Sequence, residues 1–274
     1  MPLVSTDIIL QAVPATAAFN VIQLEHAEAI VAGAEAAGLP VVLQISENAV
    51  KYHGALAPIA AATLAVARAA SVDVAVHLDH AESESLVAEA FELGFTSVMF
   101  DASKLSYADN VARTRAIAGE AAQLGVWLEA ELGEIGGKDG AHAPGVRTDV
   151  AEASEFVAQT GVNGLAVAVG SSHAMTSRSA SLDFELIRSL ADAVPVPLVL
   201  HGSSGVSDAD IRHAVERGMR KVNIATHLNV LFTESVRATL DANPTMVDTR
   251  KYLGAARDVV ETEVARLVRL ISGS

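Results

Sequence analysis

Short apolar runs alternate along this chain with longer segments in which apolar residues recur every three or four positions. A short run of this kind predicts a buried strand, and the longer pattern predicts a helix with one hydrophobic face. Strands are expected at residues 17–21, 40–45, 72–78, 97–101, 126–132, 164–170, 197–201 and 221–225. Helices are expected at residues 24–37, 56–70, 83–93, 107–124, 151–160, 184–193, 208–217 and 228–240, with a last helix at about 251–271.

Glycine follows several of these helices, at the position where a left-handed backbone often ends a helix. The residues are Gly38, Gly94, Gly125, Gly161 and Gly218. Eight strand–helix units without a change in composition favour an α/β fold, a single closed (β/α)8 TIM barrel with an extra C-terminal helix, over a doubly wound sheet. No G-x-G-x-x-G follows the first strand, and no linker rich in Pro, Gly or Ser divides the chain. We therefore expect residues 1–274 to form a single barrel domain.

Composition narrows the classes of function. Hydrophobic residues make up 51% and aromatic residues 4%, as expected for a large core of Val, Ala, Leu and Ile beneath helices. The formal net charge of −14 argues against binding to nucleic acid or to an anionic membrane surface. The chain has no cysteine, so a metal would have to bind to His, Asp or Glu. No basic segment precedes the first apolar residues, so we expect a cytoplasmic protein that does not cross a membrane.

Polar side chains gather where the expected strands end. The third strand runs into Asp79 and His80, the fourth ends at Asp101, and the fifth contains Glu129 and Glu131. In a barrel the carboxyl ends of all strands face one mouth, where such proteins place their chemistry. We interpret Asp79 as an acid and His80 as a metal ligand, pointing to different sides of the strand. The alternative is that Asp79 caps the next helix and His80 is a buried structural histidine.

Three of the nine histidines lie at matching strand ends. His80, His173 and His201 follow the third, sixth and seventh strands. Three imidazoles with an open fourth position form a catalytic zinc site that can accept a substrate oxygen. The alternative is that they are capping or core histidines placed there by chance, and their position beside Asp79 favours the metal.

Two loops are suited to a phosphate. GSSG at residues 202–205 follows the seventh strand, and NIAT at residues 223–226 closes the eighth. In this fold the loops after these two strands commonly bind phosphate through backbone amides and hydroxyls, with a helix N-terminus behind them.

None of the five lysines is suited to a Schiff base, which needs a desolvated amine within the site. Lys221 is expected at the beginning of the eighth strand, facing the wrong end of the barrel. A metal acting as a Lewis acid is therefore the better candidate for activating a carbonyl. The glycine-rich segment at residues 133–149 is suited either to a mobile active-site loop or to a plain surface loop.

The motifs that contain these residues resemble those of the class II, metal-dependent ketose-bisphosphate aldolases, which include fructose- and tagatose-bisphosphate aldolases. They are AFNV, HLDHAE, SVMFDAS, EAELGEIGG, AVAVGSSH, PLVLHGSSG and KVNIAT, and the resemblance runs from about Ala18 to Arg257. It implies a lyase that reversibly cleaves a ketose 1,6-bisphosphate into dihydroxyacetone phosphate and glyceraldehyde 3-phosphate. It also implies Zn2+ as the cofactor, and it allows for a second divalent ion or a monovalent cation such as Na+ or K+.

The resemblance also implies roles for the matching positions at the metal. The residues that would hold zinc are His80, His173 and His201. Asp79 would be the general acid that protonates the aldehyde oxygen in cleavage and handles that proton in condensation. Asp101 and Glu131 match carboxylates near a second or alternative metal position.

Other matching positions imply contacts with a phosphorylated sugar. They are Asn20, Ser46, Gly170, Gly202, Ser204, Asn223, Thr226 and Arg250. Ser46 would lie near the second phosphate, and Arg250 would reach the site of a neighbouring subunit. The family resemblance therefore implies a homodimer or homotetramer.

Three positions depart from the family pattern. Asp139 stands where the mobile loop of relatives usually presents a catalytic glutamate that moves the enediolate proton. Ala174 replaces a glycine after the metal histidine, and His227 replaces an acidic residue after Thr226. Three alternatives stay open: an aldolase for another phosphorylated ketose or keto-acid, a metal-dependent hydrolase, and a non-catalytic barrel that binds a phosphosugar.

Overall fold

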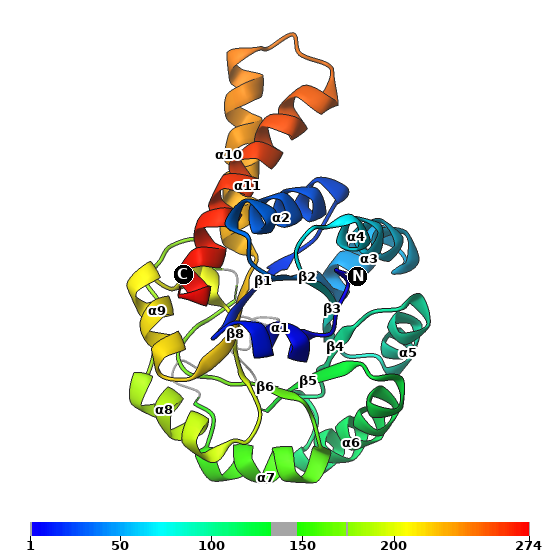
Figure 1. Ribbon diagram of the computed structural model, residues 1–274, viewed down its shortest axis with the longest axis vertical. Coiled ribbons are helices and arrows are strands. Elements are labelled where there is room, and N and C mark those ends of the chain that lie inside the picture. Colours follow the sequence, from blue (N-terminus) through cyan, green and yellow to red (C-terminus); the bar gives the residue numbers. More distant parts are fainter. Residues whose placement is uncertain (1, 133–146, 174, 274) are drawn as a thin grey trace.

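The computed structural model describes residues 2–132, 147–173 and 175–273. Eight parallel strands close into a barrel in chain order, with β8 next to β1, and the helices surround it (Figure 1). The expected (β/α)8 TIM barrel is therefore confirmed. The strands are β1 Thr16–Asn20, β2 Val41–Ser46, β3 Val74–Ala81, β4 Ser97–Phe100, β5 Trp127–Glu131, β6 Gly164–Ala166, β7 Leu198–Leu200 and β8 Met219–Ile224.

The expected helices lie within two residues of their predicted bounds. They are α2 Leu24–Ala37, α4 Ala57–Ala69, α5 Glu84–Leu93, α6 Tyr107–Leu124, α7 Val150–Thr160, α8 Phe184–Ala193, α9 Asp208–Glu216, α10 Thr226–Ala242 and α11 Thr249–Ser272. Three short elements were not predicted: α1 Thr6–Ala12, α3 Glu47–His53 and the 3-10 helix η1 Ser203–Gly205. In the described part of the chain no single helix is long and apolar enough to cross a membrane, whereas the bent pair of α3 and α4 passes that test by length and composition.

Four of the five expected glycine caps are confirmed. The left-handed caps are Gly38, Gly94, Gly125 and Gly161. The expectation for Gly218 is wrong, because α9 is capped by Arg217 in a right-handed conformation. Gly218 instead allows the chain before β8 to approach α8 closely, since a Cβ at this position would lie 2.4 Å from the Cβ of Ala191 in α8.

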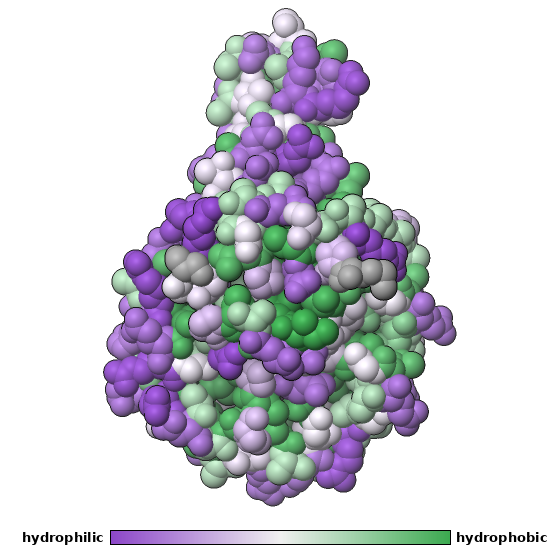
Figure 2. All heavy atoms as spheres, in the orientation of Figure 1, coloured by the Kyte–Doolittle hydropathy of each residue, from purple (hydrophilic) through white to green (hydrophobic). Residues whose placement is uncertain are grey.

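Apolar side chains fill both faces of the barrel wall. The larger cluster joins the strands to the surrounding helices and includes Phe19 and Leu128. A smaller cluster contains Met99 and Trp127 from neighbouring strands together with Leu10 of α1. Figure 1 shows α1 lying across the end of the barrel at which the strands begin. Figure 2 shows hydrophobic residues near the centre of the same face within a largely hydrophilic rim. The functional site is therefore expected at the opposite end of the barrel, where the strands finish.

Helices α10 and α11 extend beyond the barrel as a two-helix arm (Figure 1). The extra C-terminal helix is thus confirmed as α11, which packs against α2 and α10. Gly33 makes the contact with α2 possible, because a Cβ at this position would lie 2.6 Å from the carbonyl oxygen of Glu261.

Candidate active site

A cavity of about 340 Å³ opens at the carboxyl ends of the strands. This volume is at the lower end of the range for small-ligand sites. The ends of β1, β2, β3 and β8 and the segments after β6 and β7 all contribute to its lining, as expected for a barrel. The predicted residues that line it are Asn20, Ser46, Asp79, His80, His173, Gly202, Ser204, Asn223 and Thr226.

Asp79 and His80 both face this cavity, so the expectation that they point to different sides of β3 is wrong. In a regular strand neighbouring side chains do point to opposite faces. Here the pairing of β3 with β4 shifts register between Leu78 and Ala81. His80 has φ 51°, the one positive φ outside glycine in the described residues. This bulge turns two consecutive side chains into the same mouth. Asp79 is not a helix cap, because Ser83 caps α5.

The three predicted histidines converge. One nitrogen from each of His80, His173 and His201 lies within 4.8 Å of the others. His201 is fully buried, and its Nδ1 has no hydrogen-bond partner among the described residues. Burial lowers the pKa of His201 well below its usual value, and His80 adds to this. A neutral imidazole that presents a lone pair is the form that binds a metal.

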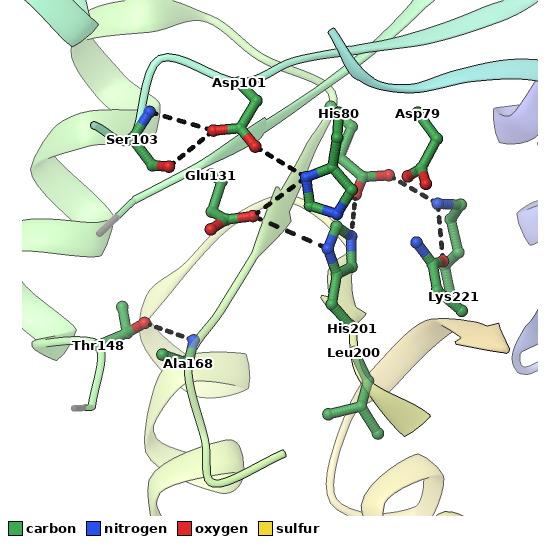
Figure 3. A network of polar contacts seen from close by, with 12 residues as sticks. Asp79, His80, Asp101, Ser103, Glu131, Thr148, Ala168, Leu200, His201 and Lys221 are labelled. Carbon is green, nitrogen blue, oxygen red and sulfur yellow. Dashed lines mark hydrogen bonds and ion pairs between the residues drawn. The ribbon is translucent and has the colours of Figure 1, made fainter. Parts of the chain in front are cut away.

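Carboxylates set the orientation of two of these rings (Figure 3). The Nδ1 of His80 lies 2.7 Å from Oδ2 of Asp101, whose other oxygen accepts hydrogen bonds from Ser103. The Nε2 of His201 lies 2.8 Å from Oε1 of Glu129. Since ionised carboxylates only accept, these nitrogens carry the protons, and the opposite nitrogens are available to a metal.

A second group of possible ligands shares His80. It consists of His80, Asp101 and Glu131, whose ligand atoms also lie within 4.8 Å of one another. Both carboxylates are buried. The structure thus brings the two predicted carboxylates next to the three histidines.

Asp79 is held by a short chain of amides. The Nδ2 of Asn20 lies 3.4 Å from Oδ2 of Asp79, and the Nε2 of Gln44 lies 2.7 Å from Oδ1 of Asn20. The Oδ1 of Asp79 is buried and has no hydrogen-bond partner in the described chain. Burial alone would raise the pKa of Asp79, but the neighbouring imidazoles, His80 first, and Lys221 hold it below its usual value. The group is therefore a carboxylate with one oxygen available for a proton.

The two loops predicted to bind phosphate are joined to each other. The Ser204 hydroxyl accepts hydrogen bonds from the backbone N–H groups of Ala225, at 3.3 Å, and His227, at 3.1 Å. Gly202 has φ 66°, and a Cβ there would lie 2.5 Å from the carbonyl oxygen of Ser172. Only glycine fits this position. The side chain of His227 does not line the cavity; its Nε2 lies 2.6 Å from Oε1 of Glu263 in α11.

Some predicted residues lie elsewhere. Gly170 is not in the cavity lining, although its φ of 118° and a carbonyl 2.2 Å from the position of a Cβ require glycine. Arg250 lies in the arm, where its 88% exposed side chain pairs with Asp248. Asp139 and Ala174 lie outside the described residues.

The expectation for Lys221 is wrong. It is the third residue of β8, fully buried, and its Nζ lies 2.9 Å from both Oε2 of Glu129 and Oδ1 of Asn223. The flexible lysine stem carries the ammonium toward the mouth even though its Cα lies early in the strand. Gln44 and Glu129 were not among the predicted site residues. Both are polar residues in strands that otherwise read as buried, and this is the signal that could have found them.

A closed barrel whose mouth holds three convergent imidazoles beside a buried carboxylate defines a metal-dependent barrel enzyme. The sequence model described as "Fructose-bisphosphate aldolase class-II" matches residues 9–274, and the chain belongs to this family of metal-dependent lyases. It is 37% identical over 280 residues to the fructose-bisphosphate aldolase of Thermus caldophilus, covering 92% of this chain and 91% of the relative. The corresponding protein of Geobacillus stearothermophilus is 36% identical over 260 residues, covering 93% and 91%. Among solved structures, the YdjI aldolase from Escherichia coli K12 has a TM-score of 0.82 at 30% identity, covering 97% of this chain and 94% of that one.

Proposed function

We propose that this chain is a zinc-dependent aldolase that reversibly cleaves a ketose 1,6-bisphosphate, fructose or tagatose, into dihydroxyacetone phosphate and glyceraldehyde 3-phosphate. The observation that carries the proposal is the convergence of three imidazole nitrogens at the barrel mouth, where Asp79, His80 and His173 line one cavity. Family membership supports a phosphorylated sugar as the substrate.

The residues fit a divalent metal. Three histidines in a chain without cysteine suit zinc, which takes three protein ligands in catalytic sites and leaves one position open. The buried Nδ1 of His201 has no hydrogen-bond partner among the described residues and lies 3.8 Å from Oε2 of Glu131, so a metal would complete its polar contacts. A metal held by His80, His173 and His201 supplies a Lewis acid that stabilises the charge left when the carbon–carbon bond breaks. Asp101 and Glu131 are candidates for holding a second divalent or a monovalent cation.

Asp79 would move the proton of the leaving aldehyde. In cleavage the hydroxyl next to the breaking bond must lose its proton to become a carbonyl, so the Asp79 carboxylate accepts it; in condensation the same group returns it. This direction is the reverse of the sequence expectation, in which Asp79 donates a proton during cleavage. The lowered pKa of Asp79 supports the carboxylate as the starting form.

The phosphates would hold the substrate so that its central carbons lie beside Asp79. Ser204, Gly202 and Thr226 border the cavity where the α10 N-terminus begins, a favourable position for one phosphate. Ser46, at the end of β2, lines the same cavity and is proposed to bind the other phosphate. Binding energy from such remote groups lowers the entropic cost of orienting the reacting bond.

We also propose a homodimer or homotetramer located in the cytoplasm. The arm of α10 and α11 supports assembly, because a shallow groove along it is lined by Leu231, Ala238 and Val259. A phosphorylated sugar substrate supports a cytoplasmic location.

A coupled assay for dihydroxyacetone phosphate tests this function. Fructose and tagatose 1,6-bisphosphate are each supplied to the protein as purified, after treatment with a chelator, and after zinc is restored. We expect cleavage that the chelator abolishes and zinc restores, and the ratio of the two rates identifies the preferred ketose. Cleavage of neither sugar by zinc-loaded protein would contradict the proposal.

A further inference from the structure

A buried lysine connects the metal-binding half of the site to the sugar-binding half. The Nζ of Lys221 donates one hydrogen bond of 2.9 Å to Oε2 of Glu129 and another of 2.9 Å to Oδ1 of Asn223 (Figure 3). Lys221 and Glu129 are both fully buried. An ion pair at this depth is expensive to desolvate and is weak evidence for a role in stability alone.

The first hydrogen bond acts on the metal ligand His201. The Glu129 carboxylate uses Oε2 to accept from Lys221 and Oε1 to accept from Nε2 of His201, at 2.8 Å. Because the carboxylate can only accept, the His201 proton stays on Nε2 and the lone pair stays on Nδ1. That Nδ1 is buried and has no hydrogen-bond partner among the described residues.

The second hydrogen bond acts on Asn223, which lines the cavity. An ammonium group has no acceptor, so the atom of the Asn223 amide that faces Lys221 must be the oxygen. The NH2 group of the amide is then left to donate to a ligand oxygen. Without Lys221 the amide could turn over and present an acceptor in place of a donor.

We propose that Lys221 is a positioning residue of the aldolase reaction: through Glu129 it fixes the metal-binding form of His201, and directly it fixes the donor orientation of Asn223. This inference rests on the proposed function, since it concerns the same site. Lys221 does not line the cavity, so it acts through these two residues and not on the sugar.

The two roles separate in a set of three variants. Lys221→Met keeps the length of the side chain and removes the charge, which leaves Glu129 as an uncompensated buried carboxylate. Glu129→Gln removes the carboxylate but keeps Lys221 beside Asn223. The double variant removes both charges, and replacing a buried ion pair as a whole is often tolerated by the fold. Metal affinity is measured by competition with a chelator in the absence of sugar, and KM is measured for the bisphosphate that the wild type cleaves.

We expect each single variant to bind zinc about 10–100-fold more weakly, the usual effect of losing support behind a metal ligand. The double variant should bind zinc no more weakly than Glu129→Gln alone, because no unpaired charge remains. KM should rise about tenfold in both variants that lack Lys221, and it should stay within about twofold of wild type in Glu129→Gln. Lys104→Met, which breaks a surface ion pair with Glu82, is the matched control and should change neither quantity.

The proposal is overturned if Lys221→Met changes only the unfolding midpoint, with zinc affinity and KM within twofold of wild type. If that variant does not fold, the double variant decides: a KM equal to that of Glu129→Gln overturns the role at Asn223. The zinc measurement needs no turnover. A wild type that binds zinc but cleaves neither sugar would therefore contradict the proposed function. The zinc affinities of the variants would still test whether Lys221 acts on His201.

Discussion

At the scale of single residues, the site depends on two neighbours doing different tasks. Oδ1 of Asp79 has no hydrogen-bond partner among the described residues and is available for a proton, while His80 supplies a nitrogen to the group of three histidines. We expect Asp79→Asn to keep zinc affinity within a few-fold and to lower kcat by about 10²–10⁴, the usual contribution of general acid–base catalysis. His201→Ala should lose both zinc and turnover. Chelator competition measures the zinc affinity of each variant, and steady-state kinetics on the same preparations measure its kcat. Near-normal turnover of Asp79→Asn would show that Asp79 has no role in proton transfer.

The identity of these residues could be predicted from sequence, but their geometry could not. The polar residues at strand ends pointed to Asp79 and to the three histidines; Asp79, His80 and His173 do line one cavity, and His201 converges with the other two histidines. The bulge that turns Asp79 and His80 the same way depends on the register between β3 and β4, and a register is a long-range property. Lys221 was misjudged for a related reason, since the position of its Cα does not determine where a long side chain ends.

At the scale of elements, the contact between α2 and α10 contains a titratable group. His26 of α2 is 4% exposed and packs against Phe232 of α10, with ring centroids 4.9 Å apart and the rings tilted by 31°. Neither of its nitrogens has a hydrogen-bond partner in the described chain. Burial lowers the pKa of His26 from 6.5 to about 4. Between these values the unfolded chain takes up a proton that the folded chain does not. The free energy of unfolding should therefore fall as the pH drops from 6.5 to 4, by on the order of 3 kcal/mol in total.

Urea unfolding at pH values between 7 and 4 measures this effect. His26→Leu should show a shallower loss of stability over that range than the wild type. Equal slopes for His26→Leu and wild type would show that the proton is taken up elsewhere.

The elements with strong periodicity could be predicted closely, and the short ones could not. Helices α2, α6 and α8 begin and end where the sequence pattern indicated, because an apolar face and a terminal signal agree. By contrast, α1 and α3 have seven residues each, too few for a helical period to stand out. Both lie at the ends of the barrel, α1 closing the bottom and α3 bordering the cavity, so their positions follow from tertiary packing.

At the scale of the whole molecule, charge sets a problem for a doubly phosphorylated substrate. The formal net charge is −14, so the overall field repels an anion. The described residues that line the cavity include no lysine or arginine. Local amides, hydroxyls and a metal can hold one phosphate. A positively charged side chain from another subunit would help to hold the other. The arm carries one candidate, Arg250 in the first turn of α11, which does not line the cavity of its own chain.

We therefore expect Arg250 to act in the site of a partner subunit. Arg250→Ala should raise KM for the bisphosphate about tenfold or more, the cost of one charge-assisted hydrogen bond, and leave zinc affinity unchanged. Subunit mixing distinguishes a shared site from an effect within one chain. When Arg250→Ala protein is dissociated and reassembled with Asp79→Asn protein, mixed assemblies contain sites with an intact Asp79 from one chain and an intact Arg250 from the other. Such sites should restore a wild-type KM, and a mixture that keeps the KM of Arg250→Ala alone would place this arginine outside the catalytic assembly.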